Sequence, residues 1–336
     1  MERGSLNPSS QKYSALIWRQ FKKSRLAVIC LVFVAILAAV AVAAPFIAND
    51  RPVLMRYNGS WSMPVLKMPV ALRGVDLYEL MSNPPAGTWM LMPPIKYSPG
   101  SYDLSSVLAA PSLQHPFGTD GDGRDVAAQL VWGSRVSLSV GVVAVGIAVA
   151  IGVLLGLIAG FYGGWIDIAV SRFIEVMICF PTFFLILAVL AFVGPSIYNI
   201  MIVIGVTGWT GVARLVRGEC LKLRRREFVM AAAASGARDR RVMLRHILPN
   251  SMAPVLVSAS FGIAGAILVE ASLSFLGFGV PPSQPSWGSM LSQAQQFMDI
   301  AWWLTLIPGS AIFFTITAYN LVGEALRDAI DPNLRT

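Results

Sequence analysis

The feature that most constrains this chain is a series of six long apolar runs within 336 residues. A bilayer whose hydrocarbon core is about 30 Å thick is crossed by about 20 mostly apolar residues in a helix. The runs that qualify, the fourth of them short, are Leu26–Ile47, Val136–Ala159, Ile174–Val193, Ile197–Ala213, Met252–Val269 and Trp302–Val322. A membrane β-barrel would instead show alternating segments of about ten residues. We therefore predict an all-α integral membrane protein with six transmembrane helices.

The composition excludes several other classes of protein. Charged residues make up 13% of the chain, about half of the roughly 25% typical of soluble domains. This excludes a disordered chain and an ordinary soluble enzyme. The net charge of +8 would suit nucleic acid, but the charges lie in loops beside apolar runs, so we predict no nucleic-acid partner. The three cysteines are widely spaced, which argues against a disulfide framework or a zinc site.

The first apolar run has a second interpretation, a cleaved signal sequence, because Ala-Val-Ala-Ala precedes Pro45. Two observations favour a retained membrane anchor. The run is longer than the 7–15 residues typical of the apolar part of a signal sequence. Proline directly after the cleavage site is also a poor context for cleavage.

Lysine and arginine predict the orientation, since they are enriched in cytoplasmic loops. The N-terminal tail, residues 1–25, is rich in both and should be cytoplasmic. Six crossings then place residues 48–130 outside and the loop 214–250 and the tail 325–336 inside. The loop 214–250 carries ten lysines and arginines, whereas residues 271–301 carry none. We predict a multi-pass protein of the bacterial cytoplasmic (inner) membrane with both termini cytoplasmic.

The external segment 48–130 is rich in Pro, Gly, Trp and Tyr, as in Asn58–Trp61 and Asn83–Pro85. Such composition is typical of turns and short strands, so we expect an irregular lobe. The lobe either contacts something outside the membrane or passively covers a cavity, and the sequence favours neither.

The cytoplasmic loop is more informative. Residues 227–234, EFVMAAAA, favour a short helix, and Ser235–Gly236 should end it, since glycine tolerates the left-handed conformation of a helix terminus. Asp239 then suits the start of a second helix that runs through His246 to Asn250. A small-residue helix fits a groove of another protein; the alternative is a basic loop that holds anionic lipid headgroups. The alanine run and the glycine favour the first interpretation, a helix that binds in a groove of another protein.

Several chemical motifs are absent. A nucleotide-binding loop GxxxxGK[ST] needs a lysine after a glycine, and none of the six lysines follows one. The elbow G-x-S-x-G and the motif H-E-x-x-H are also missing. No ionisable residue lies in the middle of an apolar run, which argues against an ion-coupled secondary transporter. We therefore predict no enzyme activity, cofactor or metal site, with energy supplied by another subunit.

Each of the two histidines, His115 and His246, lacks a second metal ligand at suitable spacing. A lone histidine of this kind more often serves as a structural hydrogen-bonding residue.

Five stretches carry a resemblance to a known family. EFVMAAAASGARDRRVMLRHILPN (Glu227–Asn250) resembles the "EAA" loop of permease subunits of bacterial ABC importers. Four others are similar to the "C"-type permease of the dipeptide/oligopeptide/nickel group: HPFGTDGDGRDV (115–126), GFYGGWIDIAVSRFIEV (160–176), EASLSFLGFGVPPSQPSWGSML (270–291) and NLVGEALRDAIDPNLR (320–335). The insert Ile47–Lys67 is similar to an oligopeptide subgroup with an enlarged external segment.

This resemblance implies a five-helix type I importer core, residues 131–324, preceded by one extra helix. It also implies a homologous second permease in a heterodimer, two cytoplasmic ATPase subunits and an external solute-binding protein. The residues that it assigns to ATPase coupling are Glu227, Ala231, Ala232, Ser235, Gly236, Arg238 and Asp239. By this resemblance the two alanines permit close approach, Gly236 permits the turn, and Glu227 acts locally in the first helical turn.

The predicted function is half of a translocation path for peptides. Alternatives are the same role for nickel or another small solute, or a membrane scaffold or embedded enzyme without transport. We assign no residue to substrate binding. The prolines and glycines within the spans either shape the path or simply kink and pack helices; they are Pro181, Pro254, Gly262, Gly265 and Pro308.

Overall fold

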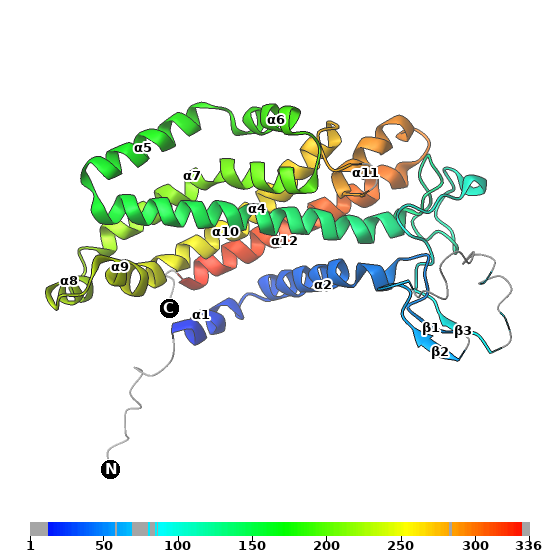
Figure 1. Ribbon diagram of the computed structural model, residues 1–336, viewed down its shortest axis with the longest axis horizontal. Helices are drawn as coiled ribbons and strands as arrows, with labels where there is room; N and C mark the ends of the chain where they lie inside the picture. Colours follow the sequence, from blue (N-terminus) through cyan, green and yellow to red (C-terminus); the bar gives the residue numbers. More distant parts are fainter. Residues whose placement is uncertain are drawn as a thin grey trace, which may run out of the picture.

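The computed structural model describes residues 13–57, 59–68, 80, 85, 87–281 and 284–330. It is an elongated bundle of helices with a small sheet at one end (Figure 1). The short helices α8 (Glu227–Ala234) and α9 (Asp239–Val242) lie at the opposite end. We refer to these as the sheet end and the loop end.

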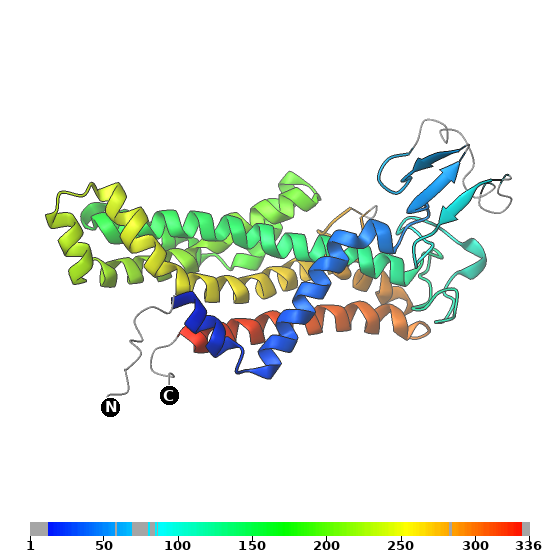
Figure 2. The ribbon, with the colours of Figure 1, turned by 90° about the horizontal axis from the view of Figure 1, so that it is seen from below.

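The remaining helices fill the length between the two ends. They are α1 (Tyr13–Phe21), α2 (Arg25–Ile47), α4 (Val126–Tyr162), α5 (Gly164–Cys179), α6 (Thr182–Val193), α7 (Ile197–Leu223), α10 (Leu248–Phe275), α11 (Trp287–Ala294) and α12 (Trp302–Ile330). The short turns of helix are η3 (Leu104–Ser106), η4 (Met243–Ile247) and η5 (Gln295–Phe297). Figure 2 shows α2 running obliquely across α4 and α12.

Among the described residues, five helices are long and apolar enough to span a membrane, and a bent pair brings the number to six. The five are α2, α4, α7, the continuous helix Asp239–Phe275, and α12. The bent pair is α5 and α6, which meet at 82°. The third predicted span, Ile174–Val193, is therefore not one straight helix but is broken between Cys179 and Thr182. Pro181 explains the break, because proline donates no backbone hydrogen bond and disfavours helical geometry at the preceding Phe180.

Several helices extend beyond the predicted spans. Helix α4 begins at Val126, inside the predicted external segment, and α12 continues to Ile330, inside the predicted C-terminal tail. The second loop helix and the fifth span form one continuous helix, because the π-helical turn η4 joins α9 to α10. The π-helical turn ends two residues before Pro249, and local adjustments of this kind allow a membrane helix to continue through a proline, which lacks the backbone N–H.

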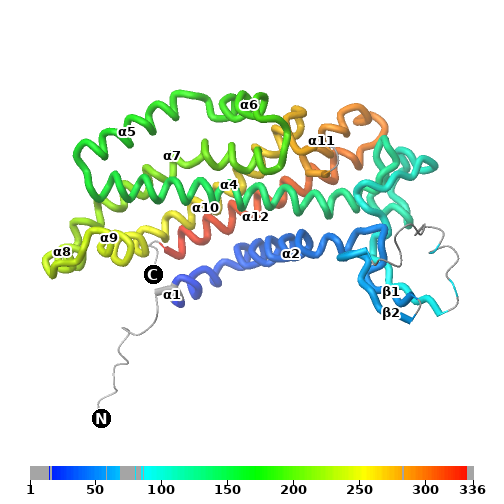
Figure 3. The backbone as a smooth tube through the Cα atoms, viewed as in Figure 1, coloured from blue at the N-terminus to red at the C-terminus, as the bar shows by residue number. Residues whose placement is uncertain are grey.

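Helices α4 and α7 form the closest pair of the bundle. Gly152, Gly156 and Gly160 lie four residues apart on α4, so they share one face. A Cβ added at Gly156 would lie 2.6 Å from the carbonyl oxygen of Ala213. Small residues of this kind allow membrane helices to pack backbone against backbone. The broken pair α5 and α6 lies along the outside of α7 (Figure 3).

The sheet end holds a three-stranded antiparallel sheet in the order β2-β1-β3, formed by Ser60–Ser62, Leu54–Tyr57 and Trp89–Leu91. Met55 of β1 pairs with Ser62 and Met90, and its side chain is fully buried. The indole of Trp132 on α4 donates to the carbonyl oxygen of Ala48 (2.7 Å), which ties the lobe to the bundle. The expected short strands are therefore present, while Asn58 and Asn83–Pro84 lie outside the described residues.

Candidate coupling loop and the polar networks of the sheet end

The loop end carries the helix, glycine turn and second helix that the sequence predicts. Helix α8 closes with two hydrogen bonds: Gly236 N–H donates to Ala233 O (3.0 Å), and Ala237 N–H donates to Ala232 O (3.2 Å). Gly236 has φ +79°, in the left-handed region that glycine adopts without a Cβ penalty. This pair of bonds with a left-handed residue is the Schellman arrangement, so the turn direction is set by local backbone geometry.

The structure brings all seven predicted coupling residues onto this one elbow. Glu227, Ala231 and Ala232 lie on α8, Ser235 and Gly236 form the turn, and Arg238 and Asp239 start α9. A Cβ built at Gly236 would meet no atom within 4 Å. Val229 is the buried residue of α8, Ala232 is half-buried, and Ala231, Ser235 and Gly236 are exposed.

The elbow is packed onto the ends of the long helices. Val229 belongs to one apolar cluster with Val216 and Cys220 of α7, Val242 of α9 and Ile247 of η4. Buried side chains therefore connect α8 with α7 and with the continuous helix Asp239–Phe275.

A charged pair extends this connection to the broken span. The Arg217 guanidinium of α7 donates to both carboxylate oxygens of Asp167 on α5, with Nη2 2.7 Å from Oδ2. Arg224 donates to the carbonyl oxygen of Phe161 at the end of α4 (2.6 Å). Ile174 is the buried residue of α5, so this bidentate pair is a principal attachment of that helix. Sequence analysis missed it, because the partners lie 50 residues apart.

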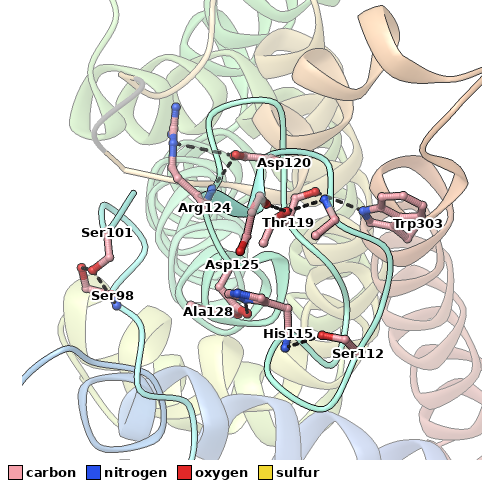
Figure 4. Close-up of polar contacts among 12 residues, drawn as sticks. Ser98, Ser101, Ser112, His115, Thr119, Asp120, Arg124, Asp125, Ala128 and Trp303 are labelled. Carbon is pink, nitrogen blue, oxygen red and sulfur yellow. Dashed lines mark hydrogen bonds and ion pairs between the residues drawn. The ribbon is translucent and has the colours of Figure 1, made fainter. Parts of the chain in front are cut away.

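The sheet end holds a polar network around His115 (Figure 4). Its Nδ1 lies 2.8 Å from Oδ2 of Asp125, and both side chains are buried. The other carboxylate oxygen of Asp125 accepts from Ala128 N–H (2.7 Å) and thereby caps α4. His115 is thus a structural hydrogen-bonding residue, as predicted. It also stacks on Tyr97, whose pKa is raised by burial and by the negative charges of Asp125 and Asp103.

The adjoining turn is closed by Asp120. Its carboxylate accepts from the backbone N–H groups of Asp122 (2.9 Å) and Arg124 (2.8 Å) and from the Gln129 amide (2.7 Å). The Trp303 indole on α12 donates to Thr119 O (3.1 Å). The carboxylates are therefore used to fasten the turn to α4. In the described part of the chain, no group of three His, Cys, Asp or Glu residues could hold a metal ion.

A second network surrounds Glu270, which sequence analysis places at the end of a span. The structure instead buries its side chain completely within α10. Its carboxyl oxygens accept from Ser137 Oγ of α4 (3.0 Å) and Ser274 Oγ of α10 (2.7 Å). Ser286, the N-cap of α11, donates to Ser274 Oγ (3.3 Å). Glu270 thus connects α4, α10 and α11. The four-residue spacing of Glu270 and Ser274 within one apolar helix was the sequence signal that could have predicted this network.

We expect Glu270→Ala to lower the free energy of unfolding by about 2–4 kcal/mol, since two buried hydroxyl groups lose their acceptor. Glu270→Gln keeps an acceptor oxygen and should cost less. Thermal unfolding of the purified assembly measures both. The control is Glu175→Ala, which removes an exposed carboxylate from α5. Equal stability of Glu270→Ala and Glu175→Ala would contradict a structural role for the network.

Comparison with known proteins assigns the chain to a family. Residues 152–336 match the family of the "Binding-protein-dependent transport system inner membrane component". The chain belongs to this family of membrane permeases. Residues 12–61 match the "N-terminal TM domain of oligopeptide transport permease C", which agrees with the prediction that the first span is a retained membrane helix.

Individual relatives agree with this assignment. The chain is 41% identical over 232 residues to the dipeptide transport system permease protein DppC of Alkalihalophilus pseudofirmus, covering 69% of this chain and 76% of the relative. It is 42% identical over 234 residues to the glutathione transport system permease protein GsiD of Escherichia coli O6:K15:H31, covering 70% and 77%. Both relatives are permeases of transport systems.

A solved structure of the MetNI methionine ABC transporter shares the fold, with a TM-score of 0.51 at 16% identity over 60% of this chain and 97% of that chain. The protein is therefore the multi-pass, membrane-embedded permease subunit of an ABC importer. Its family works with an ATPase, which hydrolyses ATP, and with a substrate-binding protein.

Proposed function

We propose that this permease forms half of the translocation path of a peptide importer and is driven through the α8 elbow by a separate ATPase subunit. The observation that carries the proposal is the exposed Schellman turn at Gly236, built from small residues and packed onto α7 and η4. Peptides are the proposed substrate class because similar proteins are named for dipeptide and glutathione transport.

The proposed mechanism is alternating access. ATP binding closes two ATPase subunits, and each docked elbow moves with its subunit. The packing around Val229 transmits this movement to α7 and α10, and the Asp167–Arg217 pair transmits it to α5. The equilibrium then shifts between inward- and outward-open states.

A cavity of about 240 Å³ between α4, α6, α7 and α10 supports this mechanism. Its lining combines branched apolar side chains, such as Ile186 and Val212, with small residues and hydroxyl groups, such as Gly262 and Ser258. Small residues let the membrane helices around it pack closely. We propose that this cavity is the chain's contribution to the path, and that a homologous second permease completes it in a heterodimer.

The orientation follows the same proposal. Helix α1 and the C-terminal end of α12 lie at the loop end, together with α8 (Figure 1). If the ATPase is cytoplasmic, both termini are cytoplasmic and the sheet end faces an external solute-binding protein. This agrees with the distribution of lysine and arginine.

The proposed function is tested in a strain that lacks this chain. We expect uptake of labelled dipeptides or longer peptides to return with the wild-type chain, and an ATPase subunit to copurify with it. Labelled nickel is measured in parallel. Nickel uptake without peptide uptake would contradict the substrate class, and purification without any ATPase subunit would contradict the coupling mechanism.

A further inference from the structure

A basic groove adjoins the coupling elbow but lies beyond the glycine turn. It has a volume of about 490 Å³ and is formed by the start of the continuous helix Asp239–Phe275. Its lining residues are Arg238, Arg240, Arg241, Leu244, Arg245 and Pro249. All six are exposed, so the groove combines four guanidinium groups with an apolar floor of Leu244 and Pro249.

The arginines of the groove have no acidic partner within the described residues. The ion pairs found there involve other cations, namely His115, Arg124, Arg172, Arg217 and Lys222. Asp239 is the single carboxylate between residues 228 and 269, and it lies at the edge of the groove. The groove therefore keeps a strong excess of positive charge and attracts an anion.

The distance of the groove from the centre of the membrane indicates which kind of anion binds there. The apolar run Met252–Val269 is centred near residue 260. With a rise of about 1.5 Å per residue, Pro249 lies about 17 Å and Arg245 about 23 Å from the centre of the membrane. The hydrocarbon core ends at about 15 Å and the headgroup layer at about 20–22 Å. Pro249 therefore lies within the headgroup layer and Arg245 at its outer edge.

We propose that this groove binds the headgroup of an anionic phospholipid. Arg241 and Arg245 pair with the phosphate, since guanidinium groups bind phosphate oxygens in bidentate geometry. Pro249, the deepest residue of the groove, contacts the glycerol and the first methylene groups. The inference rests on the proposed function, which places the loop end at the cytoplasmic leaflet, where anionic lipids attract basic residues.

The apolar floor and the depth favour a lipid over the ATPase as the occupant. Five of the seven predicted coupling residues lie before or at Gly236, and Arg238 is the one that also lines the groove. The rest of the groove, from Arg240 to Pro249, continues into the membrane-spanning helix.

The test uses the complete assembly, purified in detergent, and titrates it with phosphatidylglycerol while native mass spectrometry counts bound lipid. Each arginine near an anionic surface contributes about tenfold or less to binding. We expect Arg241→Gln/Arg245→Gln to weaken phosphatidylglycerol binding by about 30-fold and to leave phosphatidylcholine binding unchanged. Arg241→Lys/Arg245→Lys should keep part of the binding, since the charge is retained but the bidentate contacts are lost.

A matched control is Lys22→Gln/Lys23→Gln, which removes the same charge from exposed positions between α1 and α2, outside the groove. We expect this control to weaken phosphatidylglycerol binding much less than the groove variant does, because its lysines do not line the groove. Inorganic phosphate at millimolar concentration should not displace the lipid; displacement would indicate a free-phosphate site and overturn the proposal.

Equal lipid binding by the wild type and the glutamine variant would also overturn the proposal. Loss of the ATPase subunit from the glutamine variant would overturn it too, because that result would assign the groove to the ATPase interface. Failure of the proposed function can be distinguished from failure of the lipid proposal. In that case the wild-type assembly itself would purify without an ATPase subunit.

Discussion

Gly236→Asp is expected to abolish transport while the protein still inserts into the membrane and assembles. In this chain a Cβ at position 236 meets no atom within 4 Å, so the new side chain meets no obstacle from its own subunit. Within an ATPase cleft, however, it introduces an unpaired charge. An uncompensated buried charge costs about 3–5 kcal/mol, which corresponds to at least about a 100-fold loss. Peptide uptake, with protein level measured by immunoblotting, checks this.

Gly236→Asn is the matched control, because asparagine has nearly the same shape as aspartate and also tolerates the left-handed conformation. We expect Gly236→Asn to fold normally and to lose less uptake than Gly236→Asp. If Gly236 served only to end α8, the two variants would behave alike and both would transport well. Normal uptake by well-expressed Gly236→Asp would remove the elbow from the mechanism.

Gly156→Ile is expected to prevent stable packing of α4 on α7. A Cβ at Gly156 would lie 2.6 Å from Ala213 O and 2.8 Å from Val216 Cβ, and isoleucine adds further atoms beyond it. The two helices would have to separate along the closest contact of the bundle. Overpacking typically costs about 1–3 kcal/mol and sometimes more, and we expect the upper end here because backbone atoms cannot rotate away.

The measurement is the amount and the thermal stability of the assembled complex in isolated membranes. Gly146→Ile is the control on the same helix, because a Cβ there meets nothing within 4 Å. We expect Gly146→Ile to accumulate like the wild type and Gly156→Ile to be strongly depleted. Equal accumulation of the two variants would show that the glycine stripe does not determine the packing of α4 and α7.

The membrane class, the approximate spans and the elbow could be predicted from the sequence because each depends on local chemistry. About 20 apolar residues are needed to cross a bilayer wherever the helix packs. The elbow depends on a helix-favouring alanine run and one glycine, whose bonds join residues five or fewer positions apart. The break of the third span was also a local signal, Pro181, which the length of the apolar run concealed.

The rotation of each helix was decided only by the tertiary structure. In a membrane the side facing lipid is as apolar as the side facing another helix, so an apolar run does not reveal which face is inside. The contacts of Glu270 with Ser137, of Arg217 with Asp167 and of Gly156 with Ala213 all depend on that rotation. The first of these pairs lies 133 residues apart. Local sequence patterns do not predict such pairs, because these contacts form only when the packed helices bring small and polar side chains together.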